Sequence, residues 1–169
     1  MKLTAPRLEP RPEQPYAGIR VDLTMDDLQA DMVVPGLIAE IEDWLTRHGV
    51  TPVGPPFIRY HVIDMAASLD VEVAFPTDGV VAGDGRVEPG ALPAGRYAAL
   101  VYTGIEHGVA ANRALIDWAA EHGIAFDDYG SERGHGFRGR YETFLTDPAD
   151  ESDPSRWRTE VAILVAPSA

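Results

Sequence analysis

Two glutamates stand in the middle of apolar stretches. Glu160 lies in "WRTEVAILVAP" (157–167), and Glu72 lies in "LDVEVAFPT" (69–77). Removing a carboxylate from water costs free energy unless a partner replaces the lost hydration. In an apolar cleft such a group can pair with a cationic ligand, or its raised pKa can make it a general acid or base. The two glutamates are therefore the first candidates for chemistry.

Each of these stretches has two different faces, because side chains alternate across a strand. Val161 and Ile163 form an apolar face, which we expect to lie under helices. Glu160 and Ala162 share the other face, where the small alanine leaves room above the sheet. Since Glu72 has the same setting, we predict that both glutamates line a cleft on the side away from the helices. Simple exposure of that face to solvent is the alternative.

An internal repeat positions the two glutamates. "EDWLTRHGV" (42–50) matches "IDWAAEHGI" (116–124), and "DVEVAF" (70–75) matches "RTEVAI" (158–163). Hydrophobic periodicity indicates strand, helix, strand, strand in each half. We expect helices over 35–49 and 106–123, strands over 17–25, 55–64, 69–77, 95–104, 137–147 and 156–166, and a loop over 124–136.

One half is too small to bury its own sheet, so the two halves must share a core. We predict an α+β fold of two pseudo-twofold-related strand–helix–strand–strand repeats, with helices on one face of an antiparallel sheet and a central ligand cleft. Residues 1–15 are rich in proline and are expected to form an extended leader outside the core. One domain follows over 16–169, divided into repeat one (16–77), a Gly- and Pro-rich linker (78–94) and repeat two (95–166).

The composition excludes several classes of function. The 169 residues include 27 acids and 14 bases, a net charge of −13, without a Lys/Arg cluster for direct contact with nucleic acid. There are no cysteines, so thiolate catalysis and Cys-type zinc sites are excluded. No spacing of His, Asp or Glu matches a standard metal site, and we expect no cofactor. Without an apolar signal or membrane-spanning run, the expected location is the cytoplasm, with no membrane partner.

The order of several motifs resembles the GyrI-like (gyrase-inhibitor-like) family of effector-binding domains. The resemblance implies two strand–helix–strand–strand repeats around a central ligand cleft, as in the ligand-binding part of multidrug-sensing transcription regulators. Because no helix-turn-helix region is present, it implies a stand-alone member. It spans residues 16–166 and rests on "YETFLTDP" (141–148), "RTEVAILV" (158–165), "LVYTG" (100–104), "DWAAEHG" (117–123) and "LDVEVAFP" (69–76).

The resemblance also implies which residues contact a ligand. Glu160 matches an acid on the floor of an aromatic-walled cleft that binds lipophilic cations or other drug-like molecules. Glu142 matches a second acid of the family pattern. After Gly104 this chain has Glu106 and His107 where the family commonly has proline and an aromatic residue. The expected ligand-binding residues are Glu160, Glu142, Tyr102, Tyr60, Phe144, Glu72 and Ala162, with Phe144 in the cleft and Tyr141 on the opposite strand face.

Three functions follow from these residues. The first is binding of a lipophilic or cationic small molecule, with Glu160 as the polar anchor. The second is a small-molecule hydrolase in which Glu160 and Glu142 act as general acid and base, as the resemblance of some family members to hydrolases implies. The third is a protein-interaction module, for example an inhibitor of a topoisomerase, as the family name implies.

Overall fold

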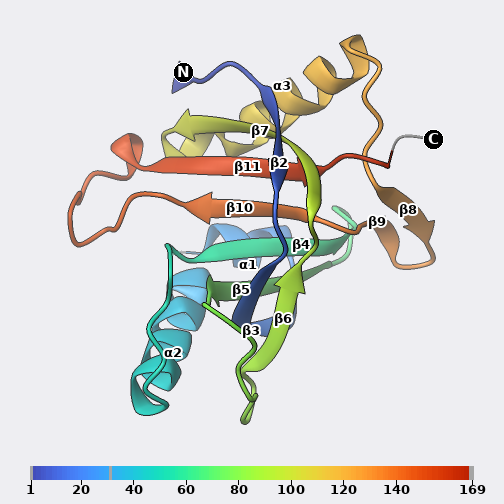
Figure 1. Cartoon of the computed structure of the whole chain (residues 1–169). Helices are drawn as coiled ribbons and strands as arrows, with labels where there is room; N and C mark the ends of the chain where they lie inside the picture. The colour runs from blue at the N-terminus through green and yellow to red at the C-terminus, as the bar shows by residue number, and fades with distance from the viewer. Residues whose placement is uncertain (1, 31, 168–169) are drawn as a thin grey trace.

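One curled antiparallel sheet, a half-barrel, contains every strand of the part of the chain that the computed structural model describes, residues 2–30 and 32–167. The main path runs β1-β7-β11-β10-β4-β5-β3-β6, with β2 beside β7 and a β8–β9 hairpin beside β4 (Figure 1). The strands are β1 Lys2–Leu3, β2 Arg7–Arg11, β3 Gln14–Leu23, β4 Phe57–Ile63, β5 Leu69–Pro76, β6 Glu88–Leu92, β7 Gly95–Thr103, β8 Asp128–Ser131, β9 Gly134–Phe137, β10 Arg140–Phe144 and β11 Arg158–Leu164.

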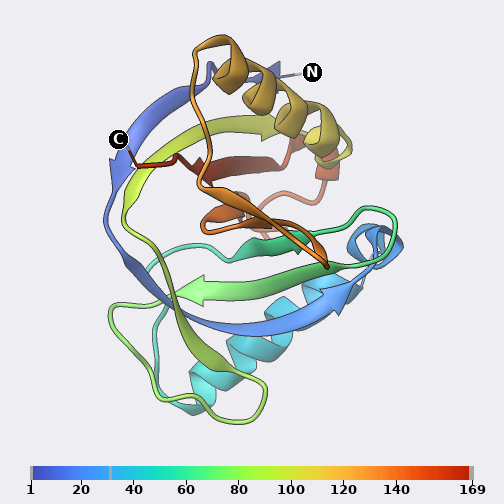
Figure 2. The same ribbon diagram turned by 90° about the vertical axis from the view of Figure 1, so that its right-hand side faces the viewer.

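The two long helices lie outside the curl of the sheet, one for each repeat (Figure 2). We call the side that they cover the helix face. The opposite side is the strand-crossed face, because the β2–β3 and β6–β7 segments cross it (Figure 1). The predicted α+β class with two strand–helix–strand–strand repeats is confirmed. The helices are α1 Met25–Gln29, α2 Val33–Arg47 and α3 Gly108–Glu121, with 3-10 turns η1 Ile105–His107 and η2 Pro154–Arg156.

Helix α2 buries the apolar side chains that its 3.6-residue period brings to one side. Ile41 and Leu45 are buried there, together with Leu37 and Trp44. They pack on the helix face of β5, where Val71 is fully buried in the same cluster. The apolar face of the first glutamate strand therefore lies under a helix, as predicted.

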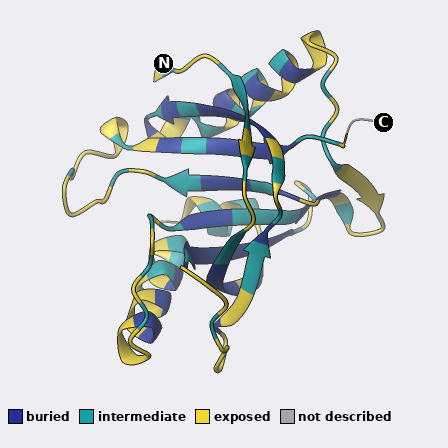
Figure 3. Ribbon diagram, in the orientation of Figure 1, coloured by how far each residue is buried: buried dark blue, intermediate teal, exposed yellow. Residues whose placement is uncertain are grey.

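Helix α3 repeats this arrangement over the second half of the sheet. Leu115 is fully buried and packs with Val161 and Ile163 of β11. Figure 3 shows the same division, with buried central strands and exposed outer helix surfaces. The two faces predicted for the second glutamate strand are confirmed, because Ala162 belongs to a separate cluster on the strand-crossed face.

The N-terminal segment differs from the leader that the sequence predicts. Residues of β2 pair with β7, with Arg7 opposite Ala99 and Arg11 opposite Gly95. The segment is therefore a strand of the sheet and not a leader outside the core. Proline was a misleading signal, because an edge strand tolerates proline on the side that has no neighbour.

Two further segments contain strands. The linker over 78–94 contains β6, which pairs with β3. The expected loop over 124–136 includes β8 and most of β9, and Asp128 of this hairpin pairs with Phe137. All four residues of β8 are exposed, so this strand has no alternation of buried and exposed residues that a sequence pattern could reveal. None of the described helices has the length and apolar character needed to cross a membrane.

Candidate functional site

The register between β10 and β11 separates the two predicted catalytic acids. Glu142 is directly opposite Val161, and Thr143 is directly opposite Glu160. Paired residues share a face, so Glu142 lies on the helix face and Glu160 on the strand-crossed face. The strands are neighbours, as predicted, but Glu142 and Glu160 lie on opposite faces, which contradicts their predicted pairing as general acid and base.

The aromatic residues of β10 follow the same alternation. Phe144 shares the face of Glu142, as predicted, and packs against the cluster under α2. Tyr141 is opposite Ala162 and therefore lies on the face of Glu160. The expectation that Phe144 accompanies Glu160 while Tyr141 faces the helix-side core is thus reversed.

Glu160 is held by two arginines that come from β2. Its carboxylate accepts hydrogen bonds from Arg7 Nη2 at 2.8 Å and from Arg11 Nη1 at 2.8 Å. Arg11 also donates to the Tyr141 hydroxyl at 2.6 Å. Glu9 pairs with both arginines and completes a charge-balanced network. The charge of Glu160 is therefore already neutralised by the protein itself.

Sequence reasoning missed these arginines. The stretch "RLEPR" over 7–11 carries charge at every second residue, which is the spacing of one strand face. That alternation indicates a charged strand, although it does not indicate the partner strand. Arg11 lies 149 residues before Glu160 in the chain.

Glu72 is also satisfied by its own surroundings. Its carboxylate accepts a hydrogen bond from the Tyr16 hydroxyl at 2.5 Å and lies 2.9 Å from His61 Nε2. Burial opposes ionisation, but the hydrogen bonds from His61 and Tyr16 hold the pKa of Glu72 below its usual value. This environment stabilises the carboxylate without a ligand.

The space above the two alanines that follow the glutamates is filled. Ala74 and Ala162 are completely buried among tyrosine, phenylalanine and leucine side chains. The ring centroids of Tyr16 and Phe57 lie 5.4 Å apart, and those of Phe57 and Tyr141 lie 5.5 Å apart. The centre of the strand-crossed face is therefore packed protein, not the open cleft that the sequence predicts.

Glu142 has a different environment on the helix face. The Tyr102 hydroxyl donates a hydrogen bond to Glu142 Oε1 at 2.9 Å. Burial raises the pKa of Glu142, and hydrogen bonding with Tyr102, Tyr60 and Asn112 together with the charge of Arg140 only partly offsets the effect. The structure thus brings together three of the predicted ligand-binding residues: Glu142, Tyr60 and Tyr102.

The charge of Glu142 has no ion-pair partner among the described residues. Of the other two buried carboxylates, Asp70 forms an ion pair with Arg20, and Glu72 lies within hydrogen-bond distance of His61. The nearby Arg140 donates instead to Asn112 Oδ1 at 2.9 Å. Among the buried acids of residues 2–30 and 32–167, Glu142 alone is surrounded by hydroxyl and amide groups.

The first turns of α3 cover Glu142. A side-chain carbon at Gly108 would lie 3.0 Å from the Tyr102 hydroxyl, so the backbone of this turn rests directly on that ring. Asn112 follows one helical turn later and interacts with Glu142. The segment η1, with Glu106 and His107, leads into this turn. It begins after Gly104, whose φ of 97° favours glycine.

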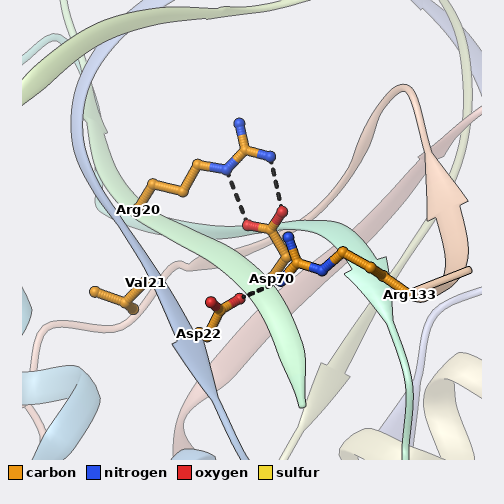
Figure 4. A pocket seen from close by; sticks show the side chains of 5 residues that line it. All are labelled: Arg20, Val21, Asp22, Asp70 and Arg133. Carbon is orange, nitrogen blue, oxygen red and sulfur yellow. Dashed lines mark hydrogen bonds and ion pairs between the residues drawn. The ribbon is translucent and has the colours of Figure 1, made fainter.

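A small polar pocket lies beside β3, β5 and the β8–β9 turn (Figure 4). It has a volume of about 270 Å³ and is lined by charged side chains of β3, β5 and the β8–β9 turn. Arg20 forms a bidentate ion pair with Asp70, with hydrogen bonds of 2.9 and 2.8 Å. Arg133 donates a hydrogen bond to Asp22 at 3.0 Å. Every charged side chain of the pocket is already paired with another, so none is free to bind a charged ligand.

Within the described ranges no three His, Asp or Glu side chains are grouped as a metal site.

Solved structures share this fold. The C-terminal domain of EcmrR superimposes with a TM-score of 0.74 at 16% identity, covering 97% of this chain and 98% of that domain. EcmrR in complex with DNA gives a TM-score of 0.75 at 16% identity, covering 97% of this chain, which spans 58% of the EcmrR chain.

Two further structures carry functional descriptions of their own. A hydrolase from Listeria innocua matches with a TM-score of 0.62 and 16% identity, covering 95% of this chain and 91% of the hydrolase. SAV2435 bound to tetraphenylphosphonium matches with a TM-score of 0.59 and 9% identity, covering 96% and 94%. At these identities the likeness shows the fold alone. A search of curated proteins finds no match.

The family assignment rests on the sequence of nearly the whole chain. The model of the GyrI-like small molecule binding domain matches residues 4–166. This range includes β2, which confirms that the N-terminal strand is part of the domain. It also agrees with the motifs over 69–76, 100–104 and 141–165. The chain belongs to the family of GyrI-like small molecule binding domains.

Proposed function

We propose that this domain binds a lipophilic cation on its helix face, with Glu142 as the anchor. The observation that carries the proposal is a buried carboxylate whose charge has no ion-pair partner in the described part of the chain. Such a group is costly to ionise in isolation, and a cation that enters its surroundings removes that cost.

The neighbours of Glu142 suit this ligand class. Tyr60 and Tyr102 lie on the same face of the sheet and interact with the carboxylate. Their aromatic rings can attract a cation electrostatically, while the surrounding apolar cluster accommodates lipophilic groups. The tetraphenylphosphonium complex of SAV2435 shows that a related fold binds a lipophilic cation, which supports the same class of ligand here.

Binding at Glu142 requires the covering segment to move. Gly108 rests on Tyr102, and Asn112 lies beside the carboxylate. We therefore expect the turn from Gly104 to Asn112 to shift when a ligand binds. Amide exchange in this turn should change on ligand addition, whereas exchange in α2 should not.

The experiment that tests the proposal measures the affinity for tetraphenylphosphonium by calorimetry. Glu142→Gln keeps the size of the side chain and removes the charge, so we expect affinity to fall at least about tenfold. Glu160→Gln is the matched control, because Glu160 is neutralised by Arg7 and Arg11 on the other face. Equal losses in both variants, or a loss only in Glu160→Gln, would contradict the Glu142 anchor.

The geometry does not support the hydrolase with paired glutamates. Glu142 and Glu160 lie on opposite faces of the sheet, so they cannot act on one bond from two sides. The protein-interaction hypothesis stays a prediction. A topoisomerase captured equally well by the parent protein and by Glu142→Gln would favour it.

A further inference from the structure

A second pocket lies on the strand-crossed face, where β1, β7 and β11 run side by side. Its volume is about 580 Å³. It is separate from Glu142, which lies on the other side of the sheet. The lining residues are Lys2, Leu3, Thr4, Val101, Thr103, Arg156 and Arg158. Three of the seven carry positive charge, although the chain as a whole carries a net charge of −13.

The strand register places two of these cations on either side of one threonine. Thr103 of β7 is paired with Lys2 of β1 and also with Arg158 of β11. All three residues therefore form one row across three strands, with their side chains on the same face. Lys2 is the only lysine of the chain.

The acidic side chains near this row are already paired with arginines. Glu160 is two residues beyond Arg158 on the same strand face, but it is bonded to Arg7 and Arg11. Glu151 and Asp153 lie 3.5 and 3.8 Å from Arg156. Lys2 and Arg158 have no ion pair within residues 2–30 and 32–167. Lys2 and Arg158 lie on either side of Thr103, so an anion above Thr103 can interact with both.

The pocket also has an apolar part. Val101 of β7 lies on this face, with Thr4 and Thr103 beside it. A ligand that satisfies both parts has an anionic head for the cations and an apolar body that lies on the sheet.

We propose that the pocket between β1, β7 and β11 binds a small amphipathic carboxylate, with its head between Lys2 and Arg158 and its chain over Val101. This is a second site with the opposite charge preference from the site at Glu142. Because the two sites lie on opposite faces and take ligands of opposite charge, either proposal can fail without the other.

The test uses octanoate as the probe and the amide resonances of Val101 and Thr103 as the readout. We expect octanoate to shift these resonances in a saturable way and to bind more weakly at high salt, since part of the attraction is electrostatic. Octanol and octyltrimethylammonium, which have similar chains without the negative charge, should produce little or no shift.

Variants of the two cations identify the site. Arg158→Gln and Lys2→Gln should each weaken octanoate binding by about tenfold, the factor expected for one charged hydrogen bond. Arg158→Lys keeps the charge and should retain most of the affinity. Arg113→Gln on the exposed surface of α3 is the matched control and should bind like the parent.

Three results would overturn the proposal. The first is octanol or the cation shifting Val101 and Thr103 as strongly as octanoate does. The second is Arg158→Gln binding octanoate as well as Arg113→Gln. The third is octanoate shifting only resonances of the helix face around Tyr102.

Discussion

Glu142 and Glu160 lie on neighbouring strands but meet different groups. Glu160 accepts hydrogen bonds from two guanidinium groups, whereas Glu142 interacts with hydroxyl and amide groups. The two guanidinium groups balance the charge of Glu160, whereas burial raises the pKa of Glu142. At the scale of single residues, the partners of an acid and not its apolar neighbours in sequence decide what it can bind.

The raised pKa of Glu142 predicts a pH dependence of stability. Its ordinary value is 4.5, and burial raises it in the folded protein. The stabilisation from this group is fully present below pH 4.5 and is lost as the pH rises through the folded pKa. Glu142→Gln should therefore gain unfolding free energy relative to the parent as the pH rises.

Urea unfolding at acidic and at slightly alkaline pH measures this difference. Glu88→Gln, at an exposed position of β6, is the control and should show the same small effect at both pH values. A difference between Glu142→Gln and the parent that does not change with pH would contradict the prediction.

At the scale of elements, strand β2 has three roles. It extends the sheet by pairing with β7, and it supplies Arg7 and Arg11 to Glu160. Its Leu8 packs against the cluster under α3. A segment that appears from its prolines to be a leader is therefore part of the framework of the domain.

Removal of residues 2–11 should destabilise the domain by about 3 kcal/mol or more, because Glu160 loses its partners. The exposed edge of β7 should also promote self-association. Urea unfolding and light scattering measure the two effects. The double variant Arg7→Gln/Arg11→Gln keeps the strand and should lose stability without self-association. A truncated chain that is monomeric and as stable as the parent would show that β2 contributes neither.

At the scale of the whole molecule, the two repeats form one folding unit. The β2–β3 and β6–β7 segments run from one half to the other and pair with strands of both. Strands β4 and β10 join the halves a second time in the middle of the sheet. Each half thus completes part of the other's sheet.

We expect core truncations in either half to lower the same unfolding transition. Ile41 under repeat one and Leu115 under repeat two are both completely buried, so Ile41→Ala and Leu115→Ala should each cost about 2–5 kcal/mol. Ile116→Ala, at the neighbouring exposed position, should change stability by less than about 0.5 kcal/mol. Two separate transitions in calorimetry of either core variant would contradict a single unit.

Local patterns were sufficient for the repeat, for the two long helices and for the two faces of each glutamate strand. Val161 and Ile163 lie under a helix and Glu160 lies away from it, because alternation along a strand is a property of consecutive residues. Hydrophobic spacing likewise predicts α2, whose buried residues include Leu37 and Ile41.

Which side chains lie next to one another depends on the pairing of strands that are distant in the sequence. The register between β10 and β11 sends Glu142 to the helix face, and a shift of one residue would send it to the other. The pairing of β2 with β7 brings Arg11 to Glu160 across 149 residues. Both depend on hydrogen bonds between distant segments, which no local pattern encodes. Alternation along the chain is enough to predict two-faced strands, whereas the pairing of distant strands places Glu160 beside two arginines and Glu142 beside two tyrosines.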